Sequence, residues 1–206
     1  MSLCAALKDG LAPDGGLYVP AHCPDLGPAA FEDWATIEAV AERLLRPFVD
    51  GDPFVDSLPE ICAATYGFPV PLRPIGRRTH VLELFHGPTA AFKDVGARFL
   101  ADSLARLNED ADQPLTILVA TSGDTGAAVA AAFWKKPNVE VVVLYPRGKV
   151  SARQEKQLTG WDTNVQTVAV RGVFDDCQDL VKEAFQAPTW QERLRLSSAN
   201  SINIGR

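Results

Sequence analysis

The stretch LTILVATSGDTGAAVAAAFW, residues 115–134, contains the pattern that decides the fold. Residues 115–120 form a short apolar run rich in Val, Ile and Leu, which predicts a buried strand. The polar turn TSGDTG at 121–126 follows, and an alanine-rich segment then predicts a helix. The sequence therefore predicts a strand, a tight turn and a helix in direct succession.

The turn at 121–126 allows two interpretations. The first backbone N–H groups of a helix have no partner within the helix, and the helix dipole adds partial positive charge, so small anions are favoured there. Ser122 and Thr125 would add hydroxyl groups to such an anion site. However, Ser, Thr and Asp are also preferred helix caps. These six residues alone predict either a well-capped helix or a ligand site.

Strand and helix patterns alternate along the second half of the chain. Strands are predicted at 139–145 and 163–170, and helices at 151–158 and 173–186. Apolar strands that alternate with helices are typical of a parallel sheet covered by helices on both faces. Right-handed crossovers would place the strand ends, and the polar turn with them, at the sheet edge where ligands usually bind.

The N-terminal part has a different pattern. Apolar residues recur at helical spacing over 31–49, and SLPE at 57–60 has the spacing of a capping box that would start another helix. Three prolines and three arginines at 69–78 indicate a connection. We therefore predict a mainly helical region over 1–78, followed by an α/β region over 79–206.

Lys93 occupies a chemically unusual position. Residues 81–85 predict a strand, and a helical pattern begins near Ala90, which places Lys93 in the first turn of a helix. Cations are favoured at the opposite end of a helix, so this lysine needs an explanation. Asp94 would neutralise it in a purely structural interpretation. Alternatively, the positive helix end and apolar neighbours favour the neutral amine that a Schiff base or a general base requires.

The composition argues against several functional classes. The 206 residues carry a formal net charge of -6 without a basic patch, which counts against a nucleic-acid partner. The apolar runs are too short for a membrane span and the N-terminus lacks a signal-peptide pattern, so we predict a cytoplasmic protein. The four cysteines and three histidines lack the spacing of metal ligands, and no nucleotide-binding glycine motif occurs.

Five motifs in order along the chain resemble the threonine synthase family, whose members are fold-type II pyridoxal phosphate enzymes. The motifs are GLAPDGGLYVP at 10–20, ELFHGPTAAFKD at 83–94, ATSGDTGAAV at 120–129, YPRGKVSARQEKQL at 145–158 and SANSINIGR at 198–206. The resemblance implies an α/β fold like that of the tryptophan synthase β subunit, with parallel sheets flanked by helices and pyridoxal 5'-phosphate as cofactor. Family members continue well past the position of Arg206, so we expect the C-terminal part of the fold, with the loop for the cofactor phosphate, to be missing here.

The resemblance also implies roles for individual residues. Lys93 would be the catalytic lysine that binds the cofactor covalently. Phe92 and Asp124 would lie beside the cofactor ring. The residues implied in substrate binding are Ser122, Gly123, Thr125, Asn200, Ser201 and Arg206.

The implied reaction converts O-phospho-L-homoserine and water to L-threonine and phosphate by γ-elimination and β-addition. The alternatives are a related phospho-lyase that gives 2-oxobutyrate and an inactive truncated fragment; the implied phosphate-binding residues count against an amino-acid dehydratase. We expect a small-molecule substrate, no nucleic-acid or membrane partner, no metal, and a monomer or homodimer.

Overall fold

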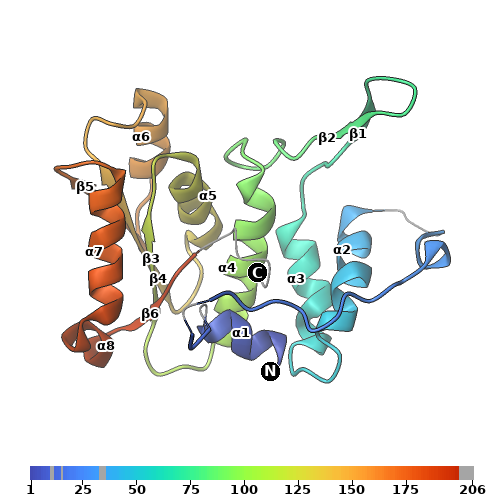
Figure 1. Ribbon diagram of the computed structural model, residues 1–206, viewed down its shortest axis with the longest axis horizontal. Coiled ribbons are helices and arrows are strands. Elements are labelled where there is room, and N and C mark those ends of the chain that lie inside the picture. Colours follow the sequence, from blue (N-terminus) through green and yellow to red (C-terminus); the bar gives the residue numbers. More distant parts are fainter. Residues whose placement is uncertain (10–11, 15, 33–35, 200–206) are drawn as a thin grey trace.

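The computed structural model describes residues 1–9, 12–14, 16–32 and 36–199, and Figure 1 shows their arrangement. The N-terminal region is mainly helical, as predicted. Its helices are α1 (Leu3–Asp9), α2 (Ile37–Leu45) and α3 (Leu58–Thr65), with 3-10 turns η1 (Pro28–Phe31), η2 (Arg46–Phe48) and η3 (Val55–Ser57). None of the helices in the described part of the chain is long and apolar enough to cross a membrane.

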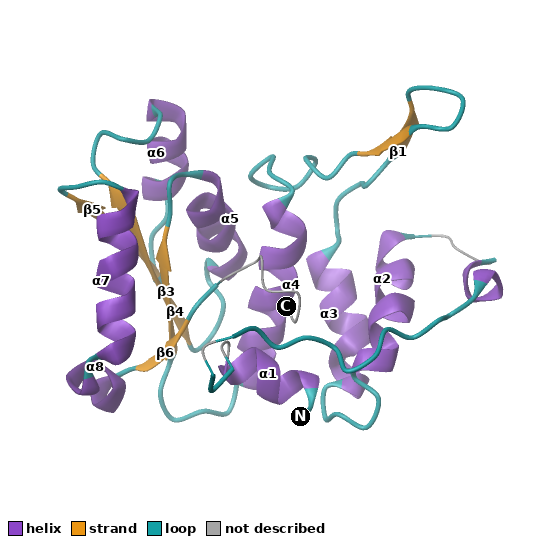
Figure 2. Ribbon diagram, in the orientation of Figure 1, coloured by secondary structure: helices purple, strands orange, loops and turns teal. Residues whose placement is uncertain are grey.

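The second half forms a four-stranded parallel sheet with the strand order β5-β4-β3-β6. The strands are β3 (Leu115–Ala120), β4 (Val139–Pro146), β5 (Val165–Val170) and β6 (Arg195–Ser197). The helices are α4 (Lys93–Leu107), α5 (Asp124–Phe133), α6 (Ala152–Thr159), α7 (Phe174–Gln186) and α8 (Pro188–Arg193). Figure 2 shows α7 on one face of the sheet and α5, with α4 beyond it, on the other. The predicted parallel sheet with helices on both faces is confirmed.

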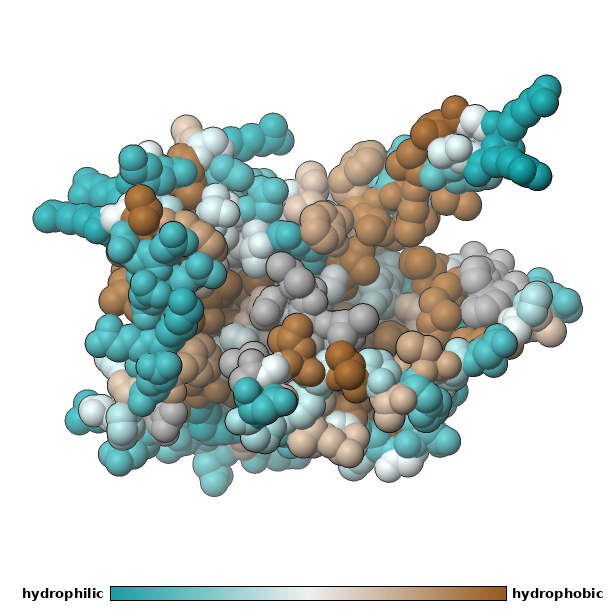
Figure 3. Space-filling view, viewed as in Figure 1, coloured by the Kyte–Doolittle hydropathy of each residue, from teal (hydrophilic) through white to brown (hydrophobic). Residues whose placement is uncertain are grey.

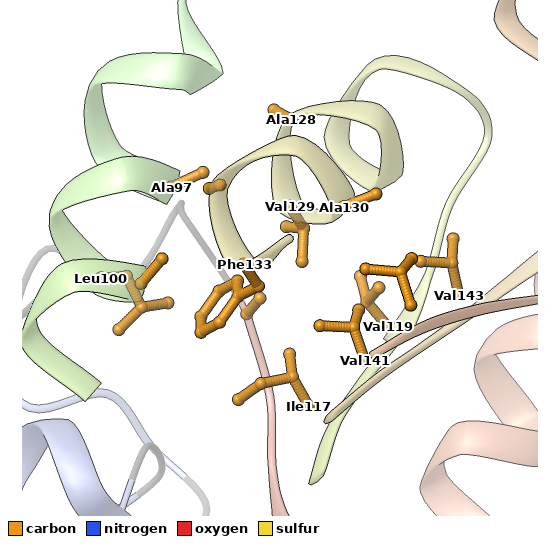
Figure 4. Packing of buried hydrophobic residues seen from close by; sticks show 14 of the residues in the cluster. Ala97, Leu100, Ile117, Val119, Ala128, Val129, Ala130, Phe133, Val141 and Val143 are labelled. Carbon is orange, nitrogen blue, oxygen red and sulfur yellow. The ribbon is translucent and has the colours of Figure 1, made fainter. Parts of the chain in front are cut away.

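The main hydrophobic core lies between the sheet and the pair α4 and α5. Ile117, Val141 and Val143 are fully buried and point toward α5, where Phe133 is equally buried. Figure 4 shows Leu100 of α4 beside the Phe133 ring, which fills the space between this helix and the strands. Burial of this apolar surface is the main favourable contribution to folding of the α/β region.

A second core lies within the N-terminal region and also includes α4. Phe99 of that helix packs with Phe54 and Leu58. Asp52 attaches α1 to this core, because its buried carboxylate accepts hydrogen bonds from the backbone N–H groups of Cys4 and Phe54, at 3.0 Å each, and from the Cys4 thiol. Burial opposes the charge, but these hydrogen bonds outweigh it and lower the pKa of Asp52. Helix α4 is thus shared by both cores.

The connection predicted at 69–78 contains a strand that the sequence did not indicate, and one expected helix cap is absent. Strand β1 (Leu72–Pro74) pairs antiparallel with β2 (His80–Leu82) in a separate ribbon. Figure 3 shows apolar side chains along this ribbon, in contrast to the hydrophilic surface of α7. Ser57 forms no capping box because its backbone is helical, with φ -89° and ψ -11°, whereas a cap residue is usually extended. Its hydroxyl instead accepts a 3.3 Å hydrogen bond from Arg106.

The main core gives the first prediction. Phe133→Ala removes a fully buried ring, so we expect the free energy of unfolding to fall by about 3–5 kcal/mol. Leu180→Ala is the control, since this α7 side chain is 44% exposed and its loss should change stability by roughly 0.5 kcal/mol or less. Denaturant titration of both variants in the intact protein measures the difference. Equal losses in the two variants would contradict this placement of the core.

Candidate active site

A tightly bonded loop positions Lys93 at the start of α4. Asp94 is fully buried, and its carboxylate accepts hydrogen bonds from the backbone N–H and the hydroxyl of Thr89, at 2.9 and 2.7 Å. A side chain on Gly87 would lie 2.6 Å from the same carboxylate, so this position requires glycine. Asp94 therefore holds the loop in place, which differs from the structural interpretation in which it neutralises Lys93.

The amine of Lys93 is left open to a ligand. The side chain is half-buried, and its Nζ lies 4.3 Å from the centroid of the Phe92 ring. No carboxylate within the described ranges forms an ion pair with this amine. Phe92 itself is 64% exposed, which is unusual for a large apolar ring beside a helix start. The pair therefore presents an unpaired amine and an apolar surface together.

Thr121 caps the start of α5, a role that the sequence interpretation did not assign to it. Its buried hydroxyl oxygen accepts hydrogen bonds from the backbone N–H groups of Gly123 and Gly126, at 3.0 and 2.9 Å. The Thr121 methyl group also packs so closely that a side chain on Gly126 would lie 2.4 Å from it. The only sequence signal for this role is a threonine at the end of an apolar strand, two residues before a glycine.

Because Thr121 provides the cap, the next hydroxyl groups remain available. Ser122 is exposed and Thr125 is half-buried. Neither hydroxyl, nor the backbone N–H of Asp124 or Thr125, has a hydrogen-bond partner within the part of the chain that the structure describes. Gly123 makes the turn with φ 147° and ψ -93°, in the region that favours glycine. The turn thus contains both a cap and a set of open donors for an anion.

The remaining predicted substrate residues, Asn200, Ser201 and Arg206, lie outside the described residues. The segment just before them is well placed, because β6 pairs with β3 and Ala199 is buried in the main core. This segment is therefore an ordered part of the sheet and of the main core. Its sequence gave no strand signal, since β6 has three residues and depends on pairing with β3.

Helices α4 and α5 bring the two halves of the site to one end of the molecule. Both helices begin at the upper side of Figure 1, where β3 and β4 end, and they pack against each other along the shared core. A separate cavity of about 560 Å³ lies on the other side of α4, lined by residues that include Tyr18, Tyr66 and Phe99. That cavity faces the N-terminal helices and is not part of the candidate site.

Comparison with known proteins identifies the class of enzyme. A family model described as "Pyridoxal-phosphate dependent enzyme" matches residues 70–204, so the chain belongs to that family. A second model, "Threonine synthase N terminus", matches residues 1–66. Membership in this family confirms the predicted cofactor class, pyridoxal phosphate.

Three proteins to which the chain is similar are each named threonine synthase. The protein from Escherichia coli (strain K12) is 44% identical over 208 residues and that from Schizosaccharomyces pombe 39% identical over 219 residues. The crystal structure of pyridoxal-phosphate-bound threonine synthase from Brucella melitensis superposes with a TM-score of 0.90 at 37% identity, over 100% of this chain and 46% of that one. The first relative is matched over 100% of this chain and 48% of its own length, and the second over 98% and 42%. The chain spans about half the length of the curated relatives it matches.

The described residues fit part of the cofactor. Pyridoxal phosphate needs a primary amine that is free to condense with its aldehyde, and Lys93 offers one without an ionic partner among the residues described. The exposed Phe92 ring provides an adjacent apolar surface.

The cap in the turn gives the second prediction. Thr121→Val keeps the shape of the side chain but leaves the N–H groups of Gly123 and Gly126 without their acceptor, so stability should fall by about 1–3 kcal/mol. Thr121→Ser keeps the hydroxyl and should retain most of that stability. Denaturant titration of the intact protein measures both. A valine variant as stable as the wild type would show that the hydroxyl does not cap the helix.

Proposed function

We propose that the protein containing this chain is a threonine synthase, which converts O-phospho-L-homoserine and water to L-threonine and phosphate. The observation that carries the proposal is the common position of two helix starts. The open amine of Lys93 lies at the start of α4, and the open donors of residues 122–125 lie at the start of α5, at the same end of the molecule. The resemblance of the five sequence motifs to the threonine synthase family implies the substrate, and relatives that bear this name support the proposal.

Lys93 is proposed to hold the cofactor and to move protons. The cofactor, when bound, supplies an electron sink that makes the protons of the amino acid acidic. The amine of Lys93, once released by the incoming substrate, is the general base that removes the α proton and then transfers a β proton. The lack of an ion pair at this amine within the described residues supports that role, because a base must be free to lose its proton.

The turn at 121–126 is proposed to bind the carboxylate of the substrate. The N–H groups of Asp124 and Thr125 and the hydroxyls of Ser122 and Thr125 are unpaired donors among the residues described, and the helix dipole favours an anion there. Gly123 lets the backbone approach the ligand closely. Asp124 and Phe92 are both proposed to lie beside the cofactor ring.

The substrate phosphate is proposed to bind to Asn200, Ser201 and Arg206. The support for this assignment is the sequence motif alone, together with the ability of a guanidinium to make two parallel hydrogen bonds to a phosphate. Holding the leaving phosphate would stabilise the transition state as well as the bound substrate.

Three broader expectations are also proposals. Residues 1–78 are proposed to be one region that supports α4 from the side opposite the sheet, and residues 79–206 to be the cofactor-binding region. A cytoplasmic location follows from the sequence pattern, and a monomer or homodimer from the resemblance to the family.

The third prediction tests this proposal. The intact protein, supplied with pyridoxal phosphate and O-phosphohomoserine, should release threonine and phosphate, and Lys93→Ala should reduce the rate by roughly 10²- to 10⁴-fold or more. The visible absorption band of the lysine-bound cofactor should be lost as well. Lys135→Ala is the matched control, because Lys135 Nζ also lies over an aromatic ring, 4.0 Å from the centroid of Trp134, but this lysine follows the C-terminal end of α5, opposite to the polar turn.

The products separate the alternatives. Release of 2-oxobutyrate without threonine would replace the synthase by a phospho-lyase that uses the same residues. Release of neither product by the intact protein would contradict the proposed function. Equal losses of activity in the Lys135→Ala and Lys93→Ala variants would contradict the proposed role of Lys93.

A further inference from the structure

Gln154 on α6 contacts the polar turn from a different element. Its Nε2 donates a 3.0 Å hydrogen bond to Oδ1 of Asp124, the first residue of α5. Its Oε1 accepts hydrogen bonds from the backbone N–H and the hydroxyl of Ser151, at 3.2 and 2.9 Å. The backbone N–H of Gln154 in turn donates to the Ser151 hydroxyl, which completes a capping box at the start of α6. Both ends of the Gln154 amide are therefore engaged.

The contact between Gln154 and the turn is close. A side chain at Gly123 would lie 2.4 Å from Nε2 and 2.7 Å from the amide carbon of Gln154. Only glycine therefore lets the amide reach Asp124 across the turn. The backbone of Gly123, with φ 147°, is also one that other residues rarely adopt. The glycine at position 123 therefore provides the space that the Gln154 side chain occupies.

Asp124 needs such a partner because of where it lies. A carboxylate in the first turn of a helix is attracted to the unpaired N–H groups there, which are the same groups that a ligand anion would use. Within the described residues, the Asp124 side chain has no other hydrogen-bond partner than Gln154. If Gln154 did not hold it, the Asp124 carboxylate would be free to turn toward the open donors and compete with an anionic substrate.

We propose that Gln154 is a positioning residue that holds the Asp124 carboxylate toward α6 and so keeps the donors of residues 122–125 open for the carboxylate of the substrate. This inference rests on the proposed function, because it takes the turn as the site of an amino-acid carboxylate. The inference assigns to that site a residue from outside the turn, Gln154, and explains why an amide side chain is needed there.

The test uses Gln154→Glu in the intact protein. Glutamate is as good a capping-box residue as glutamine, so the start of α6 is retained, but the donor to Asp124 is replaced by a like charge. We expect the dissociation constant for L-threonine, measured from the shift of the visible cofactor band, to rise roughly tenfold or more, as for loss of one hydrogen bond to a charged group. The KM for O-phosphohomoserine should rise similarly, with a smaller change in kcat.

A second substitution separates positioning from simple loosening. In the Gln154→Glu background, Asp124→Asn removes the competing charge, so the dissociation constant for L-threonine should return toward that of the Asp124→Asn single variant. Gln157→Ala is the control on the same helix, because its side chain has no hydrogen bond to any described residue, and only its backbone carbonyl accepts one, from Trp161. It should bind L-threonine as the wild type does.

Failure of the role proposed for Gln154 can be distinguished from failure of the proposed function. The titration with L-threonine requires no turnover, so failure of the wild type to form threonine would refute the synthase while the titration still decides the role of Gln154. Wild-type affinity in Gln154→Glu would overturn the inference. So would a double variant that binds L-threonine as weakly as Gln154→Glu alone.

Discussion

The packing of α4 against α5 is the contact on which the candidate site depends. Alanines are almost completely buried on both helices, Ala97 on α4 and Ala127, Ala128 and Ala130 on α5. Small side chains let two helices approach closely, and here they also let both helices begin at the same end of the molecule. Lys93 starts one helix and the polar turn starts the other. A longer side chain at this contact would separate the two halves of the site.

Each helix start is secured by its own hydrogen bonds, and these leave the chemically useful groups free. Asp94 binds Thr89 in the loop before α4, so it does not neutralise Lys93. Thr121 caps α5, so the hydroxyls of Ser122 and Thr125 are not used for that purpose. Structural and ligand-binding interpretations of these segments are therefore compatible. In each segment one residue stabilises the helix start, and its neighbours remain free to bind a ligand.

The sequence predicted the parts of the fold that are encoded locally. The apolar runs at 115–120 and 139–145 form buried parallel strands, and the helix predicted at 151–158 is α6. Strands β1 and β6 were not predictable, because each has only three residues. Strand β6 also depends on pairing with the distant β3, whereas β1 pairs with the nearby β2. The same limit applies to Gln154, whose contact with the turn joins residues 30 positions apart. The positions of Lys93 and the turn were predictable, but their common location required the packing of two helices.

A crystal structure of the intact protein with pyridoxal phosphate and an unreactive analogue of O-phosphohomoserine would show whether the starts of α4 and α5 form one site. We expect the cofactor on Lys93 and the carboxylate of the analogue hydrogen-bonded to donors of residues 122–125. A cofactor attached to another lysine, or an analogue whose carboxylate lies away from this turn, would contradict this expectation.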